Sequence, residues 1–216
     1  MTSLRPIAFA LLLAAPLAAQ QHQPDHDKPV AGGGTLPAGW KGRLDSGGAS
    51  LAGVKVMPMG GGLHVVSGPA GIYYRPADKQ AGEYAAAGTF TQMEPAAHPE
   101  AYGLFIGGAD LDGANQKYTY FLVRQDGKYL IKRRAGSTTP TIADWTDSSA
   151  IRKADASGKM SNTLAVEVAR DKVHFLVNGT EVLATDAGKV DTAGIAGVRI
   201  NHNLNVQVDG FAVKPR

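Results

Sequence analysis

The segment Leu164–Ala184 reads LAVEVARDKVHFLVNGTEVLA and decides the fold class. Apolar and other residues alternate through Leu164–Ala169 and again through Val173–Val177, which is the pattern of half-buried β-strands. Arg170–Lys172 separates these two strands as a turn. Asn178-Gly179 then supplies the positive φ angles that a tight hairpin requires. The segment therefore predicts a meander of three antiparallel strands that ends near Ala184.

Similar short strands extend along the chain on both sides of this meander. A second hairpin is indicated where Gln125-Asp126-Gly127 joins two strands. The further predicted strands are Leu63–Ser67, Ile72–Arg75, Glu83–Met93, Tyr102–Ile106, Tyr118–Arg124, Lys128–Arg134, Ile195–His202 and Val206–Val213. Asp144–Ile151 is the one place where a helical turn is expected. At least ten short strands with regular turns indicate an all-β sandwich or barrel.

Composition limits the function classes. The 216 residues include no cysteine, so thiol chemistry, thiolate metal sites and disulfides are excluded. The 22 Lys and Arg against 19 Asp and Glu give a net charge of +3. The only basic run, Lys132–Arg134, falls within a predicted strand. We therefore expect no nucleic-acid partner, because nucleic-acid-binding proteins usually carry a clustered basic face.

The N-terminal segment Met1–Ala19 has the pattern of a secretory signal peptide. Arg5 precedes an apolar run from Ile7 to Ala15, and small residues lead to Gln20. Such a run is too short to span a bilayer, which favours cleavage near Ala19 over an uncleaved anchor. We therefore expect a protein that is secreted or periplasmic, with no stable membrane anchor.

Residues 20–37 are polar and rich in Pro and Gly, which is typical of a flexible linker. The remaining residues, 38–216, are expected to form one β-sandwich domain. Without the leader the chain would have 197 residues and a net charge of +2, because Arg5 is the only charged residue of the first 19. A nearly neutral domain is consistent with a partner other than nucleic acid.

Alternation also divides the strand residues between two faces. One face of each strand is apolar and is expected to pack on a second sheet. The opposite, mixed face carries Tyr120, Arg124, Glu167, His174, Arg199 and Asn201. Such a face is either a ligand-binding surface or ordinary solvated surface.

The order of these elements resembles the concanavalin A-like jelly roll. The resemblance rests on Gly39-Trp40, the Tyr102–Ile106 strand, the Tyr118–Arg134 hairpin and the block from Asn162 to Gly179. That block is similar to the strand, turn, strand and Asn-Gly sequence of laminin G-like and keto-disaccharide hydrolase-like exported domains. The resemblance covers roughly residues 38–214. It implies a two-sheet antiparallel jelly-roll sandwich, in a superfamily that includes lectins, glucanases and adhesion modules.

No catalytic signature of that superfamily maps onto this chain. A retaining glucanase needs two carboxylates about 5 Å apart, and each glutamate here is isolated within its strand. A pair formed across two strands stays open. The segment Gly48–Ala52 only half matches a nucleophile elbow, and no helix is expected after it.

Polar and aromatic residues on the strands are candidates for binding a saccharide. Tyrosine rings can stack on sugar rings, and Arg, Asn and Glu can hydrogen-bond to hydroxyl groups. The candidate ligand-binding residues are Tyr74, Arg75, Tyr120, Arg124, Glu167 and Asn201. The alternative is that these side chains belong to the edge of the core or to turns.

The loop Gly107–Gln116 is a candidate calcium site. Asp110, Asp112 and Asn115 offer hard oxygen ligands on a loop, as Ca²⁺ prefers. The alternative is a polar turn in which Asp and Asn bond their own backbone.

The sequence thus favours an exported carbohydrate-recognising module without catalysis. A glycoside-processing enzyme, a hydrolase or a lyase of the keto-sugar kind, is the first alternative, with Glu167, His174, Arg124 or Asp110 as the residues to test. A structural or protein-interaction domain is the second.

Overall fold

The computed structural model describes residues 26–46, 48, 50–60 and 62–216. Within them the chain forms fifteen strands and one short 3₁₀ helix, Ala187–Lys189. One sheet contains β1 (Gly33–Gly34), β3 (Val54–Met59), β4 (Gly62–Ser67), β6 (Tyr84–Gln92), β11 (Met160–Val168), β12 (Lys172–Val177), β13 (Thr180–Asp186) and β15 (Asn205–Pro215). The other contains β2 (Lys41–Leu44), β5 (Gly71–Gln80), β7 (Ala101–Ala109), β8 (Lys117–Arg124), β9 (Lys128–Ala135), β10 (Thr141–Asp147) and β14 (Gly194–Ile200).

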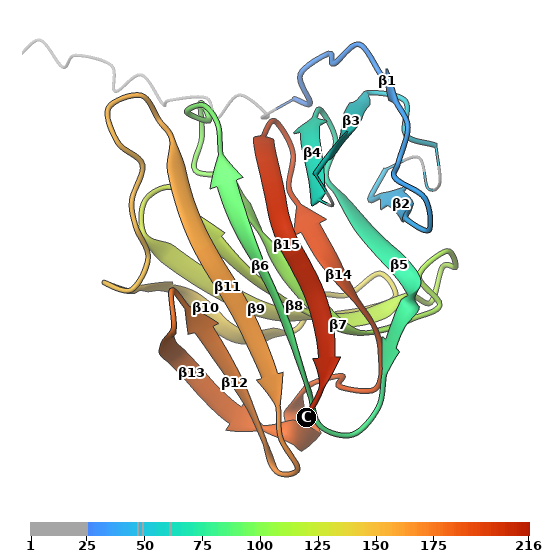
Figure 1. The fold of residues 1–216 in the computed structure, drawn as a ribbon, viewed down its shortest axis with the longest axis vertical. Coiled ribbons are helices and arrows are strands. Elements are labelled where there is room, and N and C mark those ends of the chain that lie inside the picture. The colour runs from blue at the N-terminus through green and yellow to red at the C-terminus, as the bar shows by residue number, and fades with distance from the viewer. Residues whose placement is uncertain (1–25, 47, 49, 61) are drawn as a thin grey trace, which may run out of the picture.

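The two sheets form the layers of a sandwich. Figure 1 shows β6, β11 and β15 of the eight-stranded sheet in front, with β7, β8 and β9 of the seven-stranded sheet behind them. The strand orders are β1-β3-β4-β15-β6-β11-β12-β13 and β10-β9-β8-β7-β14-β5-β2. Among the described pairings only the short β1–β3 ladder is parallel. The predicted all-β, two-sheet antiparallel jelly-roll sandwich is confirmed.

The meander predicted from Leu164–Ala184 is present as β11, β12 and β13. Leu164 pairs with Val177 and Val168 with Val173, so the apolar residues of the two strands share the inner face. Asn178 adopts a φ of 50° in the hairpin turn, and Gly179 a φ of 81°. The Asn178 side-chain oxygen accepts a hydrogen bond from the Thr163 N–H at 3.0 Å, and its amide nitrogen donates to Asn162 Oδ1 at 2.7 Å. Side-chain bonds therefore hold the turn that the Asn-Gly pair predicts.

The core lies between the sheets and is built from aromatic and branched side chains of both. Phe121 of β8 meets Phe175 of β12 edge to face, with ring centroids 5.4 Å apart. Phe90 of β6 stacks on Tyr102 of β7 at 5.7 Å. All four side chains are at most 1% exposed. These contacts across the sandwich join the sheets, which share no main-chain ladder in the described residues.

The expectation of a helical turn at Asp144–Ile151 is wrong. Residues 144–147 belong to the edge strand β10, which pairs with β9. The ladder shifts register between Thr141 and Ala143 and again between Ala143 and Thr146. These irregularities remove the simple alternation from the sequence. After β10 the chain turns, and the Ile151 N–H bonds to the Ser148 carbonyl at 3.2 Å.

The predicted leader, residues 1–19, lies outside the described residues, as do residues 20–25 of the predicted linker. The described residues of that linker, 26–37, contact the sandwich at two places. The Lys28 N–H donates to Asn203 Oδ1 at 2.6 Å, and Gly33–Gly34 pairs with Lys55–Val56 of β3. The described part of the chain contains no helix long and apolar enough to cross a bilayer.

Replacing Phe175 by alanine should test how strongly the contact between the sheets stabilises the fold. Deleting a buried Phe side chain leaves a cavity, so we expect the free energy of unfolding to fall by about 3–5 kcal/mol. Urea denaturation followed by fluorescence measures this change. Leu176→Ala, on the same strand but facing away from the core, should cost only about 1 kcal/mol. Equal losses in the two variants would contradict the assignment of the faces.

Candidate functional site

The outer face of the seven-stranded sheet, the face turned away from the sandwich core, carries a second apolar layer. Alternation along each strand sends one set of side chains inward and the next set to this face. The layer contains Ile72, Tyr74, Ala101, Phe105, Leu111, Tyr118, Tyr120, Leu122 and Leu130, with Trp145 and Ile195 packed at its margin. Tyr118 and Phe105 are fully buried, and Tyr120 is 7% exposed. The face is therefore a packed aromatic layer, with polar groups lying over and around it.

An ion pair between Arg199 of β14 and Asp45 lies over this layer. Arg199 donates from both terminal nitrogens to the two Asp45 carboxylate oxygens, at 3.1 and 2.6 Å. It also donates to the Tyr118 hydroxyl at 3.1 Å, and its guanidinium carbon is 5.2 Å from the Tyr120 ring centroid. The Arg199 side chain is 10% exposed and that of Asp45 31%. A two-pronged Arg–carboxylate pair of this kind is both strong and fixed in orientation.

The pair shifts the pKa values of its neighbours. Burial alone would raise the pKa of Asp45. The hydrogen bond and charge of Arg199, together with the charges of Arg134 and Arg43, outweigh burial, so the pKa of Asp45 lies below its usual value. Burial raises the pKa of both Tyr118 and Tyr120. At pH 7 the two phenols are neutral and Asp45 is ionised.

Arg43 of β2 fixes the loop that follows β7. One of its terminal nitrogens donates to the Leu111 carbonyl at 3.0 Å and to the Gly113 carbonyl at 2.7 Å. Asp112, in the same loop, accepts from the Tyr74 hydroxyl at 2.7 Å and forms an exposed pair with Lys41 at 3.4 Å. The Tyr74 hydrogen bond lowers the pKa of Asp112 below its usual value. This loop is therefore held against the outer face from two sides.

The other side of the face carries Arg124 and Trp145. The Arg124 guanidinium carbon lies 4.3 Å from the Trp145 ring centroid, in a cation–π contact, and Arg124 Nε pairs with Asp126 at 2.7 Å. Tyr74, Tyr120 and Arg124, three of the predicted ligand-binding residues, are thus brought to one face. The Tyr74 and Tyr120 rings are buried, so they expose little surface on which a sugar ring could stack. Trp145, at the margin of this face, is partly exposed.

The remaining predicted ligand-binding residues lie elsewhere. Arg75 stacks on the Trp40 and Phe211 rings, at 5.1 and 5.5 Å, and pairs with Asp78 at 2.6 Å. Asn201 follows β14 and donates to Glu100 at 3.2 Å.

Glu167 lies on the outer face of the eight-stranded sheet. Its cross-strand partner is His174, and its carboxylate pairs with Arg216 at 2.7 Å. The single mixed face expected from the sequence is therefore wrong. Tyr120, Arg124 and Arg199 lie on one side of the sandwich, and Glu167 and His174 on the other.

Four polar residues of this face, Arg43, Asp45, Lys132 and Arg134, are not among the binding residues predicted from the sequence. Lys132 is the cross-strand partner of Tyr120, and Arg134 that of Tyr118, so both lie on the outer face. Within the described residues neither has a hydrogen-bond acceptor or an ion-pair partner for its charged end. The sequence signal that could have found them is the alternation within Lys128–Arg134, which places Lys132 and Arg134 on one face of the strand and Arg133 on the other.

The proposed calcium ligands do not converge. Asp110 Oδ2 accepts the Asn115 N–H at 3.2 Å, and the Asp110 carbonyl accepts the Gly113 N–H at 2.9 Å, which is the polar-turn arrangement. Asp112 turns instead to Tyr74 and Lys41. The described residues include no group of three or more His, Asp or Glu side chains placed to hold a metal ion. Asp110 and Asp112 are thus engaged in other hydrogen bonds in this arrangement, and calcium binding by Asp110, Asp112 and Asn115 stays a prediction.

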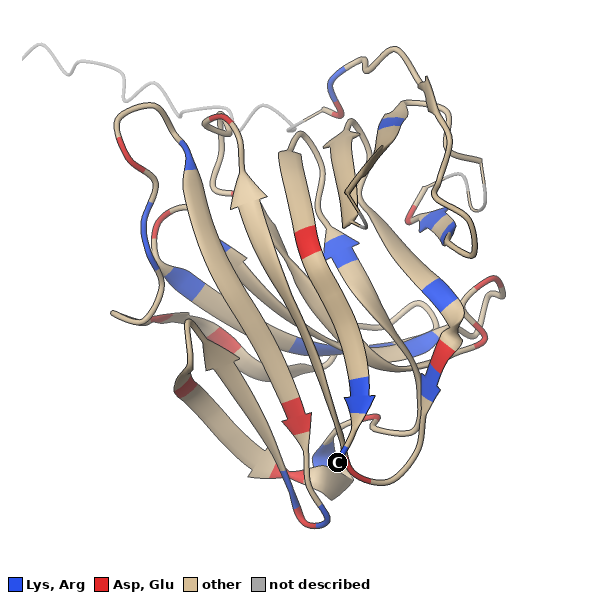
Figure 2. Cartoon of the chain, viewed as in Figure 1, with Lys and Arg blue, Asp and Glu red and all other residues tan. Residues whose placement is uncertain are grey.

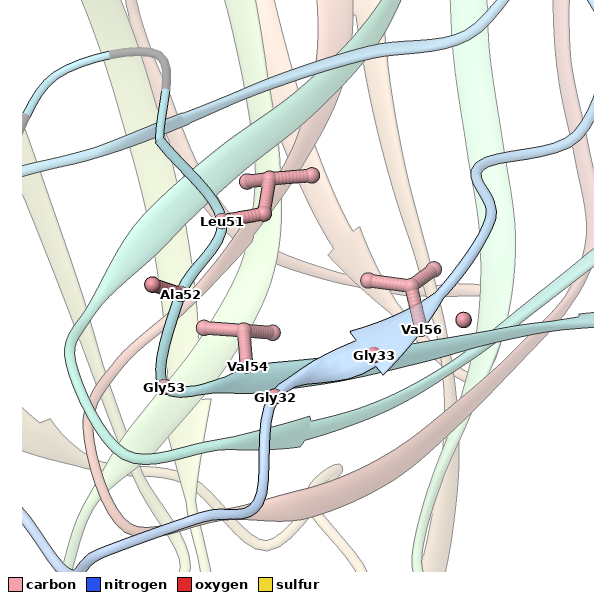
Figure 3. A pocket seen from close by; sticks show the side chains of 8 residues that line it. Gly32, Gly33, Leu51, Ala52, Gly53, Val54 and Val56 are labelled. Atoms are coloured by element: carbon pink, nitrogen blue, oxygen red, sulfur yellow. The ribbon is translucent and has the colours of Figure 1, made fainter.

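The described residues form two further cavities, and the larger of the two adjoins the outer face at Ile195. A groove of about 420 Å³ is lined by Gly32–Gly34 and by Leu51–Val54 with Val56; Figure 3 shows its small and apolar lining. A cavity of about 500 Å³ lies beside Asp110, between Lys79–Ala81 and Ala193–Ile195. The first offers few polar groups with which to orient a polar ligand. The outer face of the seven-stranded sheet carries the side-chain donors of Arg124, Lys132 and Arg134.

Comparison with known proteins identifies the fold. The carbohydrate-binding module CBM66 from Bacillus subtilis superposes with a TM-score of 0.58 at 12% identity, over 82% of this chain and 95% of that one. The chain has the concanavalin A-like jelly-roll fold. Alginate lyase A1-II′ matches with a TM-score of 0.55 at 10% identity, over 82% of this chain and 94% of that one.

The exoplasmic/lumenal domain of VIP36, in its Ca²⁺/Man-bound form, gives a TM-score of 0.54 at 7% identity and covers 82% of this chain and 83% of that one. No protein-family model and no curated protein matches the sequence. At these identities the similarity shows the fold alone.

Asp45→Asn should make stability less dependent on pH. Because the folded protein holds the pKa of Asp45 below its unfolded value, this carboxylate stabilises the fold above about pH 4. That contribution is lost as the pH falls through the lower, folded pKa. We expect the free energy of unfolding of the variant to be about 2 kcal/mol lower than that of the wild type at pH 7, because Arg199 keeps a buried charge without its partner. The difference should be smaller at pH 3, where the wild-type Asp45 carboxylate contributes less to stability.

Urea denaturation at the two pH values measures this difference. Asp186→Asn breaks the exposed Lys172–Asp186 pair and serves as the control, with little expected change in midpoint. If Asp45→Asn lowered the free energy of unfolding by the same amount at both pH values, the stabilising role of the Asp45 charge would be contradicted.

Proposed function

We propose that the protein is an exported saccharide-binding module that binds its ligand on the outer face of the seven-stranded sheet and performs no catalysis. The observation that carries the proposal is the Arg199–Asp45–Tyr118 cluster, with Lys132 and Arg134 beside it. The partly exposed donors of Lys132 and Arg134 beside this fixed pair, with the Trp145 ring at the margin, suit a ligand rich in hydroxyl groups. Support also comes from the shared fold of CBM66, which its name describes as a carbohydrate-binding module.

The distribution of carboxylates supports binding rather than hydrolysis. A glycosidase needs one carboxyl group as acid and a second as nucleophile or base. On the outer face Asp45, Asp112 and Asp126 each lie within 3.4 Å of a cationic nitrogen, of Arg199, Lys41 and Arg124 respectively. A carboxylate held in an ion pair is kept ionised and is a poor general acid. Glu167, the first candidate for an enzymatic role, is on the opposite side of the sandwich.

Binding to this face can be tested with a glycan array followed by calorimetry on the best ligand. Arg124→Gln and Trp145→Ala should each weaken binding about tenfold, because they remove a donor and a partly exposed ring from the same margin. Arg216→Gln, on the outer face of the eight-stranded sheet, is the matched control and should bind as the wild type does.

Loss of binding in Glu167→Gln but not in Arg124→Gln would move the site to the other sheet. Release of shortened or unsaturated products from the bound saccharide would replace the binding module by an enzyme. No binding to any saccharide would favour a protein-interaction domain.

Export is the second part of the proposal and rests on residues 1–19. Expression of the whole chain in a Gram-negative host should place the protein in the periplasm or the medium. N-terminal sequencing should then begin at Gln20, as expected for cleavage after Ala19. A variant without residues 2–19 should stay in the cytoplasm. A purified protein that starts at Met1 and remains with the membrane would favour the uncleaved anchor.

A further inference from the structure

The outer face of the seven-stranded sheet has more positive than negative charge. Four of its basic residues are matched by carboxylates within 4.0 Å, in the pairs Lys41–Asp112, Arg124–Asp126, Lys128–Asp147 and Arg199–Asp45. Arg43, Lys132 and Arg134 have no carboxylate within that distance among the described residues. Figure 2 shows basic residues on β2, at the edge of this sheet. Three cations of the face are thus left without a carboxylate in ion-pair contact within the described residues.

The excess charge gathers around the two central tyrosines. Arg134 faces Tyr118 across the β8–β9 ladder, and Lys132 faces Tyr120. From the other side Arg199 reaches the Tyr118 hydroxyl and lies over the Tyr120 ring. The charge of Arg134 acts on Asp45 and on Tyr118, which places its guanidinium group in the same cluster. Basic groups from β9, β14 and β2 therefore surround one patch of the face.

The acidic residues at the margin do not cancel this charge. Asp110 turns its carboxylate onto its own loop, where it accepts the Asn115 N–H. Asp144, on the edge strand β10, accepts the N–H of Trp145 at 2.8 Å. Among the described residues neither carboxylate forms an ion pair with Lys132, Arg134 or Arg199.

The arginines are anchored at their inner ends. The Nε atoms of Arg43, Arg134 and Arg199 are buried and have no hydrogen-bond partner among the described residues. Burial of Nε restrains the stem of each side chain, so less conformational entropy is lost when the terminal nitrogens bind a ligand. The terminal nitrogens of Arg134 make no hydrogen bond within the described residues. A planar guanidinium group of this kind matches the two oxygens of a carboxylate or the oxygens of a sulfate.

From this geometry we propose that the ligand is an acidic saccharide, whose carboxylate or sulfate groups bind Arg134 and Lys132 beside the Arg199–Asp45 pair. The inference rests on the proposed saccharide-binding function and specifies its ligand class. A neutral sugar could pack on Trp145 and accept hydrogen bonds from Arg134 and Lys132, but it would bring no negative charge to these two cations. The near-complete burial of Tyr74, Tyr118 and Tyr120 also leaves little ring surface for stacking, which gives charge the larger share of recognition.

The test compares an oligogalacturonate with its methyl ester, two probes that differ in the charge of the carboxyl group. Calorimetry at about 50 mM NaCl should show the acid form binding at least tenfold more tightly than the ester. The difference should shrink at about 500 mM NaCl, because salt screens exposed charges. Arg134→Gln and Lys132→Gln should each lower the ratio of acid affinity to ester affinity about tenfold, because each removes one positive charge that only the acid form can neutralise.

Lys214→Gln removes a positive charge from the outer face of the eight-stranded sheet and is the matched control for net charge. It should bind both probes as the wild type does. A sulfated glucan as a third probe distinguishes sulfate from carboxylate as the preferred anion. Thermal unfolding of each variant confirms that the sandwich is intact.

The possible failures are distinguishable. If the protein bound acid and ester with equal affinity, and Arg124→Gln weakened both, the saccharide-binding face would stand and the preference for an acidic ligand would be overturned. Binding of a single-stranded RNA of the same charge as tightly as the oligogalacturonate would overturn recognition of a saccharide. No binding of any neutral or acidic saccharide would overturn the proposed function as well.

Discussion

The architecture depends on the burial of the central strands of the seven-stranded sheet on both faces. Eight consecutive residues of β7, from Ala101 to Gly108, are buried, as are six consecutive residues of β8. An antiparallel sheet that covers a core on one side usually exposes the other to water. Here the second side carries its own aromatic layer, so a charged group on it needs a partner within the protein or a place at the margin. Arg199 satisfies this condition through Asp45, and Arg124 through Asp126 and Trp145.

The local elements could be predicted from the sequence because their signals are local. Asn178-Gly179 and Asp126-Gly127 mark their hairpins, and alternation in Leu164–Val177 gives the inner and outer residues correctly. β10 was missed because two register shifts remove the period of two, and because Trp145 belongs to a layer that no short pattern reveals. The four-residue strand β2 is too short to give a periodic signal.

The candidate site could be predicted only in part. Alternation gives the side of a strand on which a residue lies, but it does not say which sheet the strand joins. Tyr120 and Glu167 were therefore assigned to one surface although they lie on opposite sides of the sandwich. The partner of Arg199 is 154 residues away in the sequence, in the turn after β2. Only the order of strands in the sheet, β14-β5-β2, brings Asp45 to it.

The glycine-rich segment before the domain has a further consequence for the behaviour of the protein in concentrated solution. Gly33 and Gly34 occupy the hydrogen-bonding edge of β3, and a Cβ on Gly34 would lie 1.8 Å from the Val56 carbonyl oxygen. Only a residue without a side chain can approach so closely. An uncovered strand edge is a template for pairing with another chain, and proteins that cover such edges resist aggregation. Gly33 and Gly34 therefore cover the edge of β3 at Lys55 and Val56, and a truncation that removed them would leave this edge open to a neighbouring molecule.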